Sequence, residues 1–327
     1  MATLSVIMAL YNERPQDAIM AIDSIINQTF SDFELIVILD NPENNELRIL
    51  LERYVHKDNR ILFKINETNL GLPETLNRAI ELASGEYIAR MDGDDISYPE
   101  RFEIQLSYLK RYPSLDLIGS NAIIIDENNQ RIGTYKKLKS NFAQQIITRK
   151  ASINLIHPTW LGKTEWFKKL KYRNFFYVED YDFIARATYY GIKMHNIAEP
   201  LIATRIFQNK IVSVSRIKAF EQLYNARKCR EWLNFAIKYK TKEYPSLHSI
   251  YYPPEDRERY QRIIPDLNAL RTSLKTGKKI NTLKFLIRIL TKCPIAITYR
   301  AKVAIWQNLL KIIDPLCLIF EQKKYGI

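Results

Sequence analysis

Cysteine and glycine are scarce in this chain of 327 residues, which contains 3 cysteines and 9 glycines. The cysteines lie far apart and form no CxxC pair, so we expect neither a disulfide framework nor a zinc site, as is typical of an intracellular protein. The low glycine content excludes a collagen-like or low-complexity chain. No run of about 18 uncharged apolar residues is present, so the sequence predicts no transmembrane helix, and its first residues do not resemble a signal peptide.

Motifs of several enzyme classes are missing as well. No GxGxxG follows the first apolar run, which disfavours dinucleotide binding, and no GxxxxGK[ST] phosphate loop is present. The HExxH motif of zinc proteases and the GxSxG motif of serine hydrolases are also absent. The chain is nevertheless 46% hydrophobic and 12% aromatic, which is enough apolar material for a large folded core.

Positive charge is concentrated in the C-terminal third. The whole chain carries a net charge of +13, yet residues 1–200 contain 24 basic and 27 acidic side chains. Residues 201–327 contain 25 basic and 9 acidic side chains. A cationic region of this kind attracts nucleic acid, an anionic lipid surface or an anionic substrate, and composition leaves all three open.

Short apolar runs alternate with amphipathic stretches near the N-terminus. The pattern predicts strands at 4–10, 33–39, 61–65 and 87–91, with helices between them at 15–28, 44–55 and 73–83. This alternation predicts βαβ units and a parallel sheet covered by helices on both faces. Further along, the sequence predicts helices at 99–112, 140–150 and 180–190, strands at 117–126, 131–135 and 193–197, a chain break at 252–254, and helices at 215–240, 256–276, 280–291 and 302–313.

Polar side chains follow each of the first four predicted strands. They are Tyr11 to Glu13, Asp40, Asn69 to Gly71, and Asp92 to Asp95. Because ligands of open α/β sheets bind at the carboxyl ends of the strands, we expect these side chains to meet at one edge. An aromatic ring can stack on a base, and clustered carboxylates can hold a hard divalent cation, so the set suits a nucleoside diphosphate bound with a metal.

The same segments carry a resemblance to family 2 glycosyltransferases. The similar segments are SVIMALYNE at 5–13, SIINQTF at 24–30, NLGL at 69–72, and ASGEYIARMDGDD at 83–95 with Pro99 and Arg101 after it. His157-Pro158-Thr159 and Glu179-Asp180-Tyr181-Asp182 resemble segments on the acceptor side of that family. The resemblance covers about residues 3–200 and is nearest to bacterial transferases that build exopolysaccharide, capsule or O-antigen units.

The resemblance implies a GT-A fold, which is a Rossmann-like mixed sheet, and inverting transfer of a sugar from a UDP-sugar. Three residues would contact the uridine, namely Ala9, Tyr11 and Asp40, and the donor site would also include Glu13, Asn69, Gly71, Asp92, Gly93 and Asp94. The family commonly has two aspartates after the second strand. Here the first is Leu39 and the usual GST-type turn is Asn41-Pro42-Glu43, so the base contact falls to Asp40.

The resemblance also implies a metal site and a base. Asp92 and Asp94 would form the DxD pair, with Asp94 as the direct ligand of Mn²⁺ or Mg²⁺ and Asp92 at the ribose or a metal-bound water. Asp180 would be the general base, with Glu179 and His157 on the acceptor side. The remaining histidines, His56, His195 and His248, are expected to be structural or exposed.

The implied acceptor is a saccharide linked to undecaprenyl diphosphate, which places a cytoplasmic enzyme at the inner face of the membrane. We expect a catalytic domain at 1–210, with a donor half at 1–95 and an acceptor half at 96–210, and a basic helical region at 211–327. Residues 271–327 hold 12 basic and 2 acidic side chains, which suits an anionic membrane surface, a helical subdomain or a dimer interface.

Two other classes of function stay open at this point. A nucleotidyltransferase would share the α/β sheet and the metal, although the LYNERP segment is a poor phosphate loop. A nucleic-acid-binding protein would explain the pI of about 9.4, but no recognition motif accompanies the basic region, and we expect no nucleic-acid partner. The sequence does not distinguish UDP-Glc, UDP-Gal, UDP-GlcNAc and UDP-GalNAc as donors.

Overall fold

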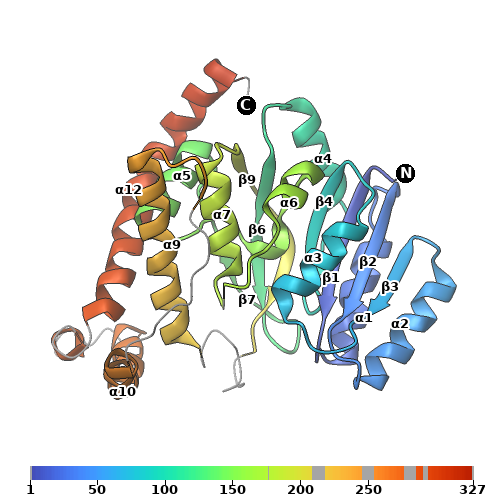
Figure 1. Ribbon diagram of the computed structural model, residues 1–327, viewed down its shortest axis with the longest axis horizontal. Helices are drawn as coiled ribbons and strands as arrows, with labels where there is room; N and C mark the ends of the chain where they lie inside the picture. Colours follow the sequence, from blue (N-terminus) through green and yellow to red (C-terminus); the bar gives the residue numbers. More distant parts are fainter. Residues whose placement is uncertain are drawn as a thin grey trace.

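The computed structural model describes residues 2–175, 177–207, 218–244, 254–275, 285–289 and 294–325. Within these ranges the centre is a nine-stranded mixed sheet in the order β3-β2-β1-β4-β8-β6-β9-β5, and β7 pairs with β6 outside this path (Figure 1). The strands are β1 (Leu4–Leu10), β2 (Phe33–Leu39), β3 (Ile61–Ile65), β4 (Tyr87–Asp92), β5 (Ile96–Ser97), β6 (Leu117–Ile125), β7 (Arg131–Tyr135), β8 (Leu161–Lys163) and β9 (Met194–Arg205).

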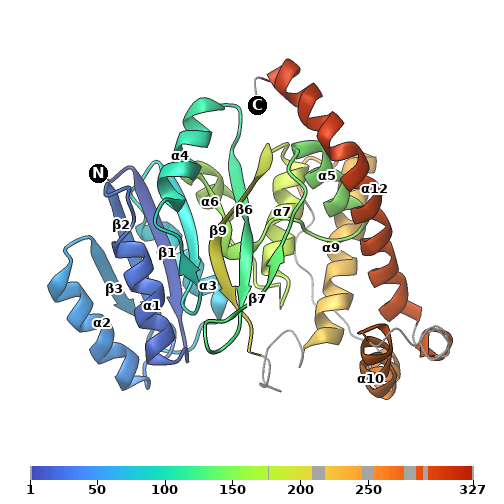
Figure 2. The same cartoon turned by 180° about the vertical axis from the view of Figure 1, so that it is seen from behind.

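Helices cover both faces of this sheet and continue beyond its far edge (Figures 1 and 2). They are α1 (Pro15–Ile26), α2 (Asn45–Lys57), α3 (Leu72–Leu82), α4 (Arg101–Arg111), α5 (Asn141–Lys150), α6 (Thr164–Leu170), α7 (Glu179–Tyr189), α9 (Ala219–Tyr239), α10 (Pro254–Lys275) and α12 (Pro294–Tyr325), with a short 3₁₀ helix η1 (His157–Thr159). In the part of the chain that the structure describes, none of these helices combines the length and apolar character needed to cross a bilayer.

The four N-terminal strands form the predicted parallel βαβ units. β1 pairs in parallel with both β2 and β4, and β2 pairs in parallel with β3. Side chains alternate between the two faces along β1, as the two-residue period of a strand requires. Val6 and Met8 pack under α1, α2 and α4, whereas Ile7 packs with α3, α6 and α7. The carboxyl ends of these strands therefore emerge together between two covered faces.

Beyond β4 the sheet becomes mixed, as the resemblance to a GT-A fold implied. β8 lies between β4 and β6 and is antiparallel to both. This strand, β5 and α6 were not predicted, because strands of two or three residues and a helix of seven are too short to show a period. The predicted strand at 193–197 is the start of the much longer β9, and the predicted helix at 302–313 is the middle of α12. The hairpin of β6 and β7 is confirmed.

Part of the C-terminal prediction lies outside the described residues. Residues 285–289 of the predicted helix at 280–291 are helical, and the rest of that range lies outside the described residues. Pro254 of the predicted break is the first residue of α10, which is a favourable position for proline because its missing N–H would have no partner there.

Two carboxylates of α12 bind the N-terminus of α5. Asp314 accepts hydrogen bonds from the backbone N–H groups of Lys139 (2.8 Å) and Ser140 (3.0 Å) and from the Ser140 hydroxyl (2.5 Å). Glu321 accepts from the N–H groups of Asn141 (3.1 Å) and Phe142 (2.8 Å). The first amides of a helix have no intrahelical partner and carry the positive end of its dipole, so these two carboxylates attach α12 firmly to the sheet domain.

We expect Asp314→Ala to lower the free energy of unfolding by roughly 2–4 kcal/mol, because it leaves several buried donors without an acceptor. Thermal or urea unfolding of the whole chain measures this loss. Asn308→Ala, at an exposed position of the same helix, is the matched control and should change stability little. Equal stability of the two variants would contradict a stabilising role for this contact.

Candidate active site

A cavity of about 730 Å³ lies at the carboxyl ends of β1, β2 and β4. It is lined by most of the residues that the sequence singled out: Ala9, Tyr11, Glu13, Asp40, Asn69, Gly71, Asp92, Glu179 and Asp180. Segments far apart in sequence are thus brought to one place, with the loop before α3 on one side and the N-terminus of α7 on the other. An adjoining cavity of about 560 Å³ shares Asp92 and Asp180 and adds Asp94, Asp95 and His157.

Asp40 organises the loop that precedes α3. Its Oδ1 accepts from Asn66 Nδ2 (2.6 Å) and Leu70 N (2.8 Å), and its Oδ2 accepts from Gly71 N (2.8 Å). Gly71 has φ +81°, a conformation that side chains other than glycine rarely adopt. A carboxylate oxygen has two lone pairs, so Oδ2 can still accept one further hydrogen bond from a ligand in the cavity.

The end of β1 presents a ring and a carboxylate. Tyr11 is 45% exposed at the cavity wall, and its backbone N–H donates to Glu13 Oε2 at 2.6 Å. Burial raises the pKa of Glu13 above its usual value. The hydrogen bond fixes the turn after β1, so the Tyr11 ring is held at the cavity wall.

Three aspartates lie within four positions at the end of β4. Potential ligand oxygens of Asp92, Asp94 and Asp95 lie within 4.8 Å of one another. The intervening Gly93 packs against β1 so closely that a Cβ would lie 2.0 Å from Leu10 Cδ2. Because Leu10 is itself fully buried, a larger residue at position 93 would displace the loop. Gly93 is therefore required by packing, whether or not it also touches a ligand.

The three carboxylates have different surroundings. Asp92 forms an ion pair with Arg90, a buried side chain of β4, and Asp95 is buried and accepts from the backbone N–H of Arg205 at 2.8 Å. Within the described residues, no hydrogen bond reaches the carboxylate of Asp94, whose backbone carbonyl accepts from Arg205 Nε at 2.9 Å. Asp94 is thus the carboxylate most available to a ligand.

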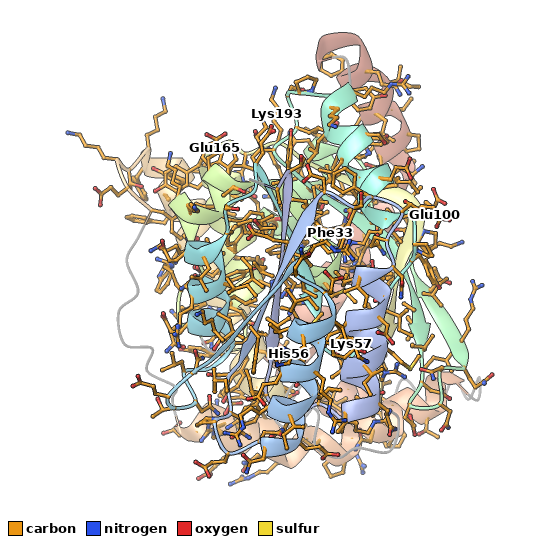
Figure 3. The ribbon with its side chains drawn as sticks, turned by 90° about the vertical axis from the view of Figure 1, so that its right-hand side faces the viewer. Phe33, His56, Lys57, Glu100, Glu165 and Lys193 are labelled. Atoms are coloured by element: carbon orange, nitrogen blue, oxygen red, sulfur yellow. The ribbon has the colours of Figure 1, made fainter. Side chains whose placement is uncertain are left out.

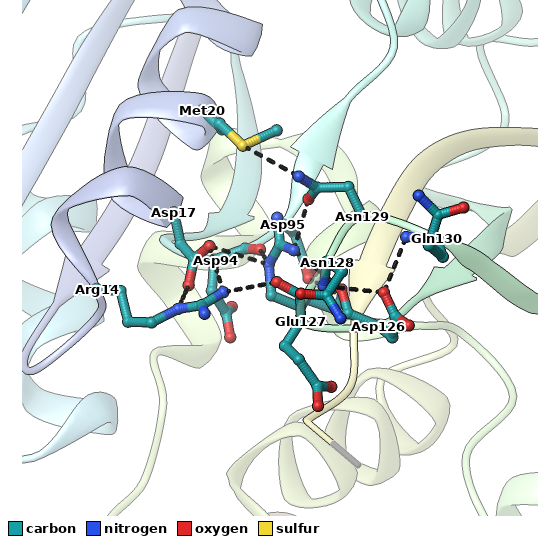
Figure 4. Close-up of polar contacts among 11 residues, drawn as sticks. Arg14, Asp17, Met20, Asp94, Asp95, Asp126, Glu127, Asn128, Asn129 and Gln130 are labelled. Carbon is teal, nitrogen blue, oxygen red and sulfur yellow. Dashed lines mark hydrogen bonds and ion pairs between the residues drawn. The ribbon is translucent and has the colours of Figure 1, made fainter. Parts of the chain in front are cut away.

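A polar network behind this loop holds it in place (Figure 4). Arg205, the last residue of β9, donates from Nη1 to the Asp126 carbonyl (3.1 Å) and to Asn129 Oδ1 (2.6 Å), and its Nε lies 3.4 Å from Asp17. Arg14 pairs with Asp17 at 2.6 Å. The network ties the acidic loop to α1 and to the hairpin of β6 and β7, so the Asp94 backbone is fixed from two sides.

The acidic loop has the chemistry of a divalent-cation site. Burial, together with the nearby carboxylates of Asp92 and Glu13, raises the pKa of Asp94 to about 7. Burial, together with the nearby carboxylates of Asp92 and Asp94, also raises the pKa of Asp95 well above its usual value. Such crowding of like charges is relieved when a cation binds, and carboxylate oxygens are the ligands that Mg²⁺ and Mn²⁺ prefer. The residues present therefore fit the metal that the sequence predicted.

Asp180 and Glu179 form the opposite wall, in the first turn of α7. Asp180 Oδ1 accepts from the Tyr181 N–H at 2.7 Å. Burial raises the pKa of Asp180, and burial together with the Asp180 charge raises the pKa of Glu179 to about 7. Asp182 is buried in ion pairs with Arg173 and Arg186, so it takes no part in this wall. A carboxylate with a raised pKa is a better proton acceptor near neutral pH.

His157 lies in the adjoining cavity and is held by its own contacts. Its Nε2 is 2.8 Å from the hydroxyl of Tyr172, and its ring packs on Trp160. Burial lowers its pKa well below the usual value, so the imidazole is neutral. Of the other histidines, His195 is buried against Tyr108 and His56 lies on the exposed side of α2 (Figure 3), while His248 lies outside the described residues.

Several residues of the site were not predicted. Asn174, Tyr177 and Gln222 also line the larger cavity, and Lys137 and Arg205 line the adjoining one. Gln222 belongs to α9, in the region where the sequence resembled nothing. Arg90 and Arg101 belong to the segment that resembles the family, but the sequence did not predict that both side chains are buried beneath the acidic loop. Arg101 Nη2 donates to the Arg90 carbonyl at 2.9 Å.

A comparison with known protein families decides what kind of protein has this site. The profile of "Glycosyl transferase family 2" matches residues 5–171, which contain the ends of β1, β2 and β4. The chain belongs to this family. Glycosyl transfer is thereby favoured over the other two functions that the sequence left open.

Relatives and solved structures agree with this assignment. The glycosyltransferase is 37% identical over 230 residues to the uncharacterized glycosyltransferase MJ1057 of Methanocaldococcus jannaschii, covering 68% of this chain and 76% of that one. It is 35% identical over 223 residues to the O-antigen biosynthesis glycosyltransferase WbnJ of Escherichia coli, covering 67% and 85% of the two chains.

The fold is similar to that of TarS from S. aureus. One crystal structure of TarS gives a TM-score of 0.52 at 20% identity and covers 68% of this chain and 39% of that chain. The structure of TarS 1-349 in complex with UDP-GlcNAc gives a TM-score of 0.52 at 18% identity and covers 89% and 73%. The predicted GT-A fold, a mixed α/β sheet with helices, is thereby confirmed.

Proposed function

We propose that this glycosyltransferase moves a hexose or N-acetylhexosamine from a UDP-sugar to a saccharide hydroxyl, with inversion, in the synthesis of a bacterial surface polysaccharide. The observation that carries the proposal is the single cavity in which Tyr11 and the Asp40 loop face Asp180 across Asp92. The similarity to WbnJ, an O-antigen biosynthesis glycosyltransferase, and to TarS, whose structure is known in complex with UDP-GlcNAc, supports the choice of pathway and donor.

The donor end of the cavity suits a uridine. The exposed Tyr11 ring can stack on a pyrimidine, and Asp40 Oδ2 has a lone pair for a base N–H. Asn69 and Gly71 stand beside it in the loop that Asp40 holds, and Ala9 also lines the cavity. A purine would need more room than the pyrimidine ring, so we expect UDP to be preferred over GDP and ADP.

The acidic loop would hold the cation near the diphosphate. Asp94 would be its direct ligand, and Asp92 would contact the ribose or a water on the metal. When bound, Mn²⁺ or Mg²⁺ would neutralise the charge of the leaving diphosphate. Asp95 is engaged with Arg205 and would fix the loop rather than bind the cation directly.

Asp180 would act as the general base. Its raised pKa suits the removal of a proton from the attacking acceptor hydroxyl. One in-line displacement inverts the anomeric centre, so an α-linked UDP-sugar would give a β-glycoside. Glu179 and His157 would contact the acceptor, and the neutral imidazole of His157 can serve as a hydrogen-bond partner but not as a cation.

The proposal includes the organisation of the chain and its place in the cell. Residues 1–210 would form the catalytic domain, with donor binding at 1–95 and acceptor binding at 96–210, and 211–327 would be a helical region packed on it. The acceptor would be a saccharide on undecaprenyl diphosphate, so the enzyme would work at the inner face of the cytoplasmic membrane. The basic C-terminal third supports this location.

Release of UDP from a panel of UDP-sugars with Mn²⁺ tests the proposed donor. We expect one or two of UDP-Glc, UDP-Gal, UDP-GlcNAc and UDP-GalNAc to be hydrolysed slowly without acceptor, and GDP-mannose to be inert. Adding an oligosaccharide diphosphate lipid should raise the rate with the same donor. Hydrolysis of GDP-mannose alone would contradict the uridine assignment.

We expect Mn²⁺ affinity to fall as the pH drops below about 7. Asp94 must lose its proton to bind a cation, and its pKa is raised to about 7 by burial and by neighbouring carboxylates. Protons therefore compete with the metal at pH 6 but little at pH 8. Calorimetric titration with Mn²⁺ at the two pH values measures this, and equal affinities would show that Asp94 is not the ligand that titrates.

A further inference from the structure

An unbroken apolar stripe runs along the exposed side of α12. Its side chains are strongly exposed, at 63% for Ile305, 46% for Leu309, 73% for Ile312, 66% for Leu316, 51% for Ile319 and 62% for Phe320. Their spacing of three or four residues places them on one face of the helix, over a length of roughly 22 Å. Figure 2 shows α12 along the edge of the molecule, outside α5 and α9.

The two acidic residues of the helix point away from this stripe. Asp314 and Glu321 are buried against the N-terminus of α5, where their carboxylates are fully engaged. Lys311, beside the stripe, is exposed. The outward side of α12 thus presents apolar groups with a basic residue, and its negative charges are turned inward.

The apolar surface continues from α12 onto α5. A cavity of about 510 Å³ lies between the two helices, with Phe142, Leu316, Cys317 and Phe320 as its apolar lining and Lys193, Gln145 and Glu321 among its polar residues. Phe142 is itself 47% exposed. The exposed apolar side chains of α12 are thus continued on α5 by Phe142.

Charge decides between a lipid surface and a second copy of the chain. Residues 271–327 carry 12 basic and 2 acidic side chains, so two copies that met along α12 would bring like charges together. An anionic bilayer attracts the same region and accepts the apolar stripe below its headgroups.

We propose that the apolar stripe of α12 docks on an anionic lipid surface, with the helix lying in the plane of the interface. This inference deepens the membrane location proposed above. It is tested without any sugar, so its failure and a failure of the proposed activity can be told apart.

Flotation with lipid vesicles tests the stripe. Full-length protein is mixed with vesicles of phosphatidylcholine alone or with added phosphatidylglycerol. We expect binding to the second kind only, and we expect the double variant Ile312→Gln, Leu316→Gln to bind at least about tenfold more weakly, because two apolar side chains no longer enter the bilayer. The control is Ile49→Gln, Val55→Gln on α2, at the other end of the molecule (Figures 1 and 2), where the side chains are also exposed.

The outcomes separate the alternatives. Equal flotation of the stripe variant and wild type would overturn the proposal, as would wild type that does not bind phosphatidylglycerol vesicles. A wild-type dimer in sedimentation that becomes a monomer in the stripe variant, without a change in flotation, would assign the stripe to a second copy instead. Circular dichroism should show both double variants folded, because every substituted side chain is exposed.

Discussion

Replacing Asp180 with asparagine is expected to lower kcat by about 10²–10⁴-fold while leaving donor binding nearly intact. Asparagine has almost the same shape and its Oδ1 can still accept from the Tyr181 N–H, so α7 should keep its first turn. It cannot take the proton of the acceptor hydroxyl. Asp182 cannot replace it, because that carboxylate is buried between Arg173 and Arg186. Steady-state transfer to an acceptor gives kcat, and calorimetry with UDP-sugar and Mn²⁺ gives Kd.

A matched variant separates loss of the base from general damage. Glu165→Gln changes a carboxylate to an amide in the first turn of α6, at the surface near the start of β4 and away from both cavities (Figure 3), and should leave kcat unchanged. If Asp180→Asn keeps more than about a tenth of the wild-type kcat, the base lies elsewhere, and Glu179 is the next candidate because its pKa is also raised, to about 7.

Asp94→Ala is expected to abolish Mn²⁺ binding and to lower kcat/KM by more than about 100-fold. Loss of a residue that only supports a metal ligand commonly costs 10–100-fold, and the loss of a direct ligand should cost more. The fold should not suffer. The raised pKa means that the ionised carboxylate destabilises the metal-free protein above about pH 7, and alanine removes that unfavourable charge. Metal-free thermal stability at pH 8 should therefore be unchanged or higher.

Thermal unfolding with and without Mn²⁺ provides the sharpest measurement for this variant. Mn²⁺ should raise the Tm of wild type at pH 8 and leave that of Asp94→Ala unchanged. Glu67→Ala removes the same charge from an exposed loop outside the cavities and should behave as wild type. Wild-type activity that survives EDTA, or a Mn²⁺-induced rise in Tm in Asp94→Ala, would refute the metal assignment.

Strong local patterns made much of the donor half predictable. The strands from Leu4 to Asp92 are apolar runs with turns after them, and the polar residues at their ends must meet because parallel strands end at the same edge. Asp92 and Asp94 stood out because carboxylates seldom cluster directly after a buried strand. The resemblance added Asp180, which no period or spacing would have selected from the first turn of an ordinary helix.

The residues that support the site could not be predicted from the sequence, because strand pairing and helix packing bring them there. Arg205 reaches the acidic loop only because β9 runs beside β6 and β5, and a single arginine at a strand end gives no signal of its own. Gln222 reaches the cavity through the packing of α9 on α7, in a region where the sequence predicted a helix but contained no motif that pointed to the site. β8 is only three residues long, and its position is set by its pairing with β4 on one side and β6 on the other.

The attachment of α12 to α5 has a consequence for the order in which the protein folds. The contacts of Asp314 with Ser140 and of Glu321 with Asn141 join residues 174 and 180 positions apart. During synthesis the chain emerges from its N-terminus, and the parallel sheet can assemble long before position 321 is made. The backbone amides at the start of α5 then stay hydrogen-bonded to water until α12 has been synthesised. The catalytic fold is therefore completed only when nearly the whole chain has been translated.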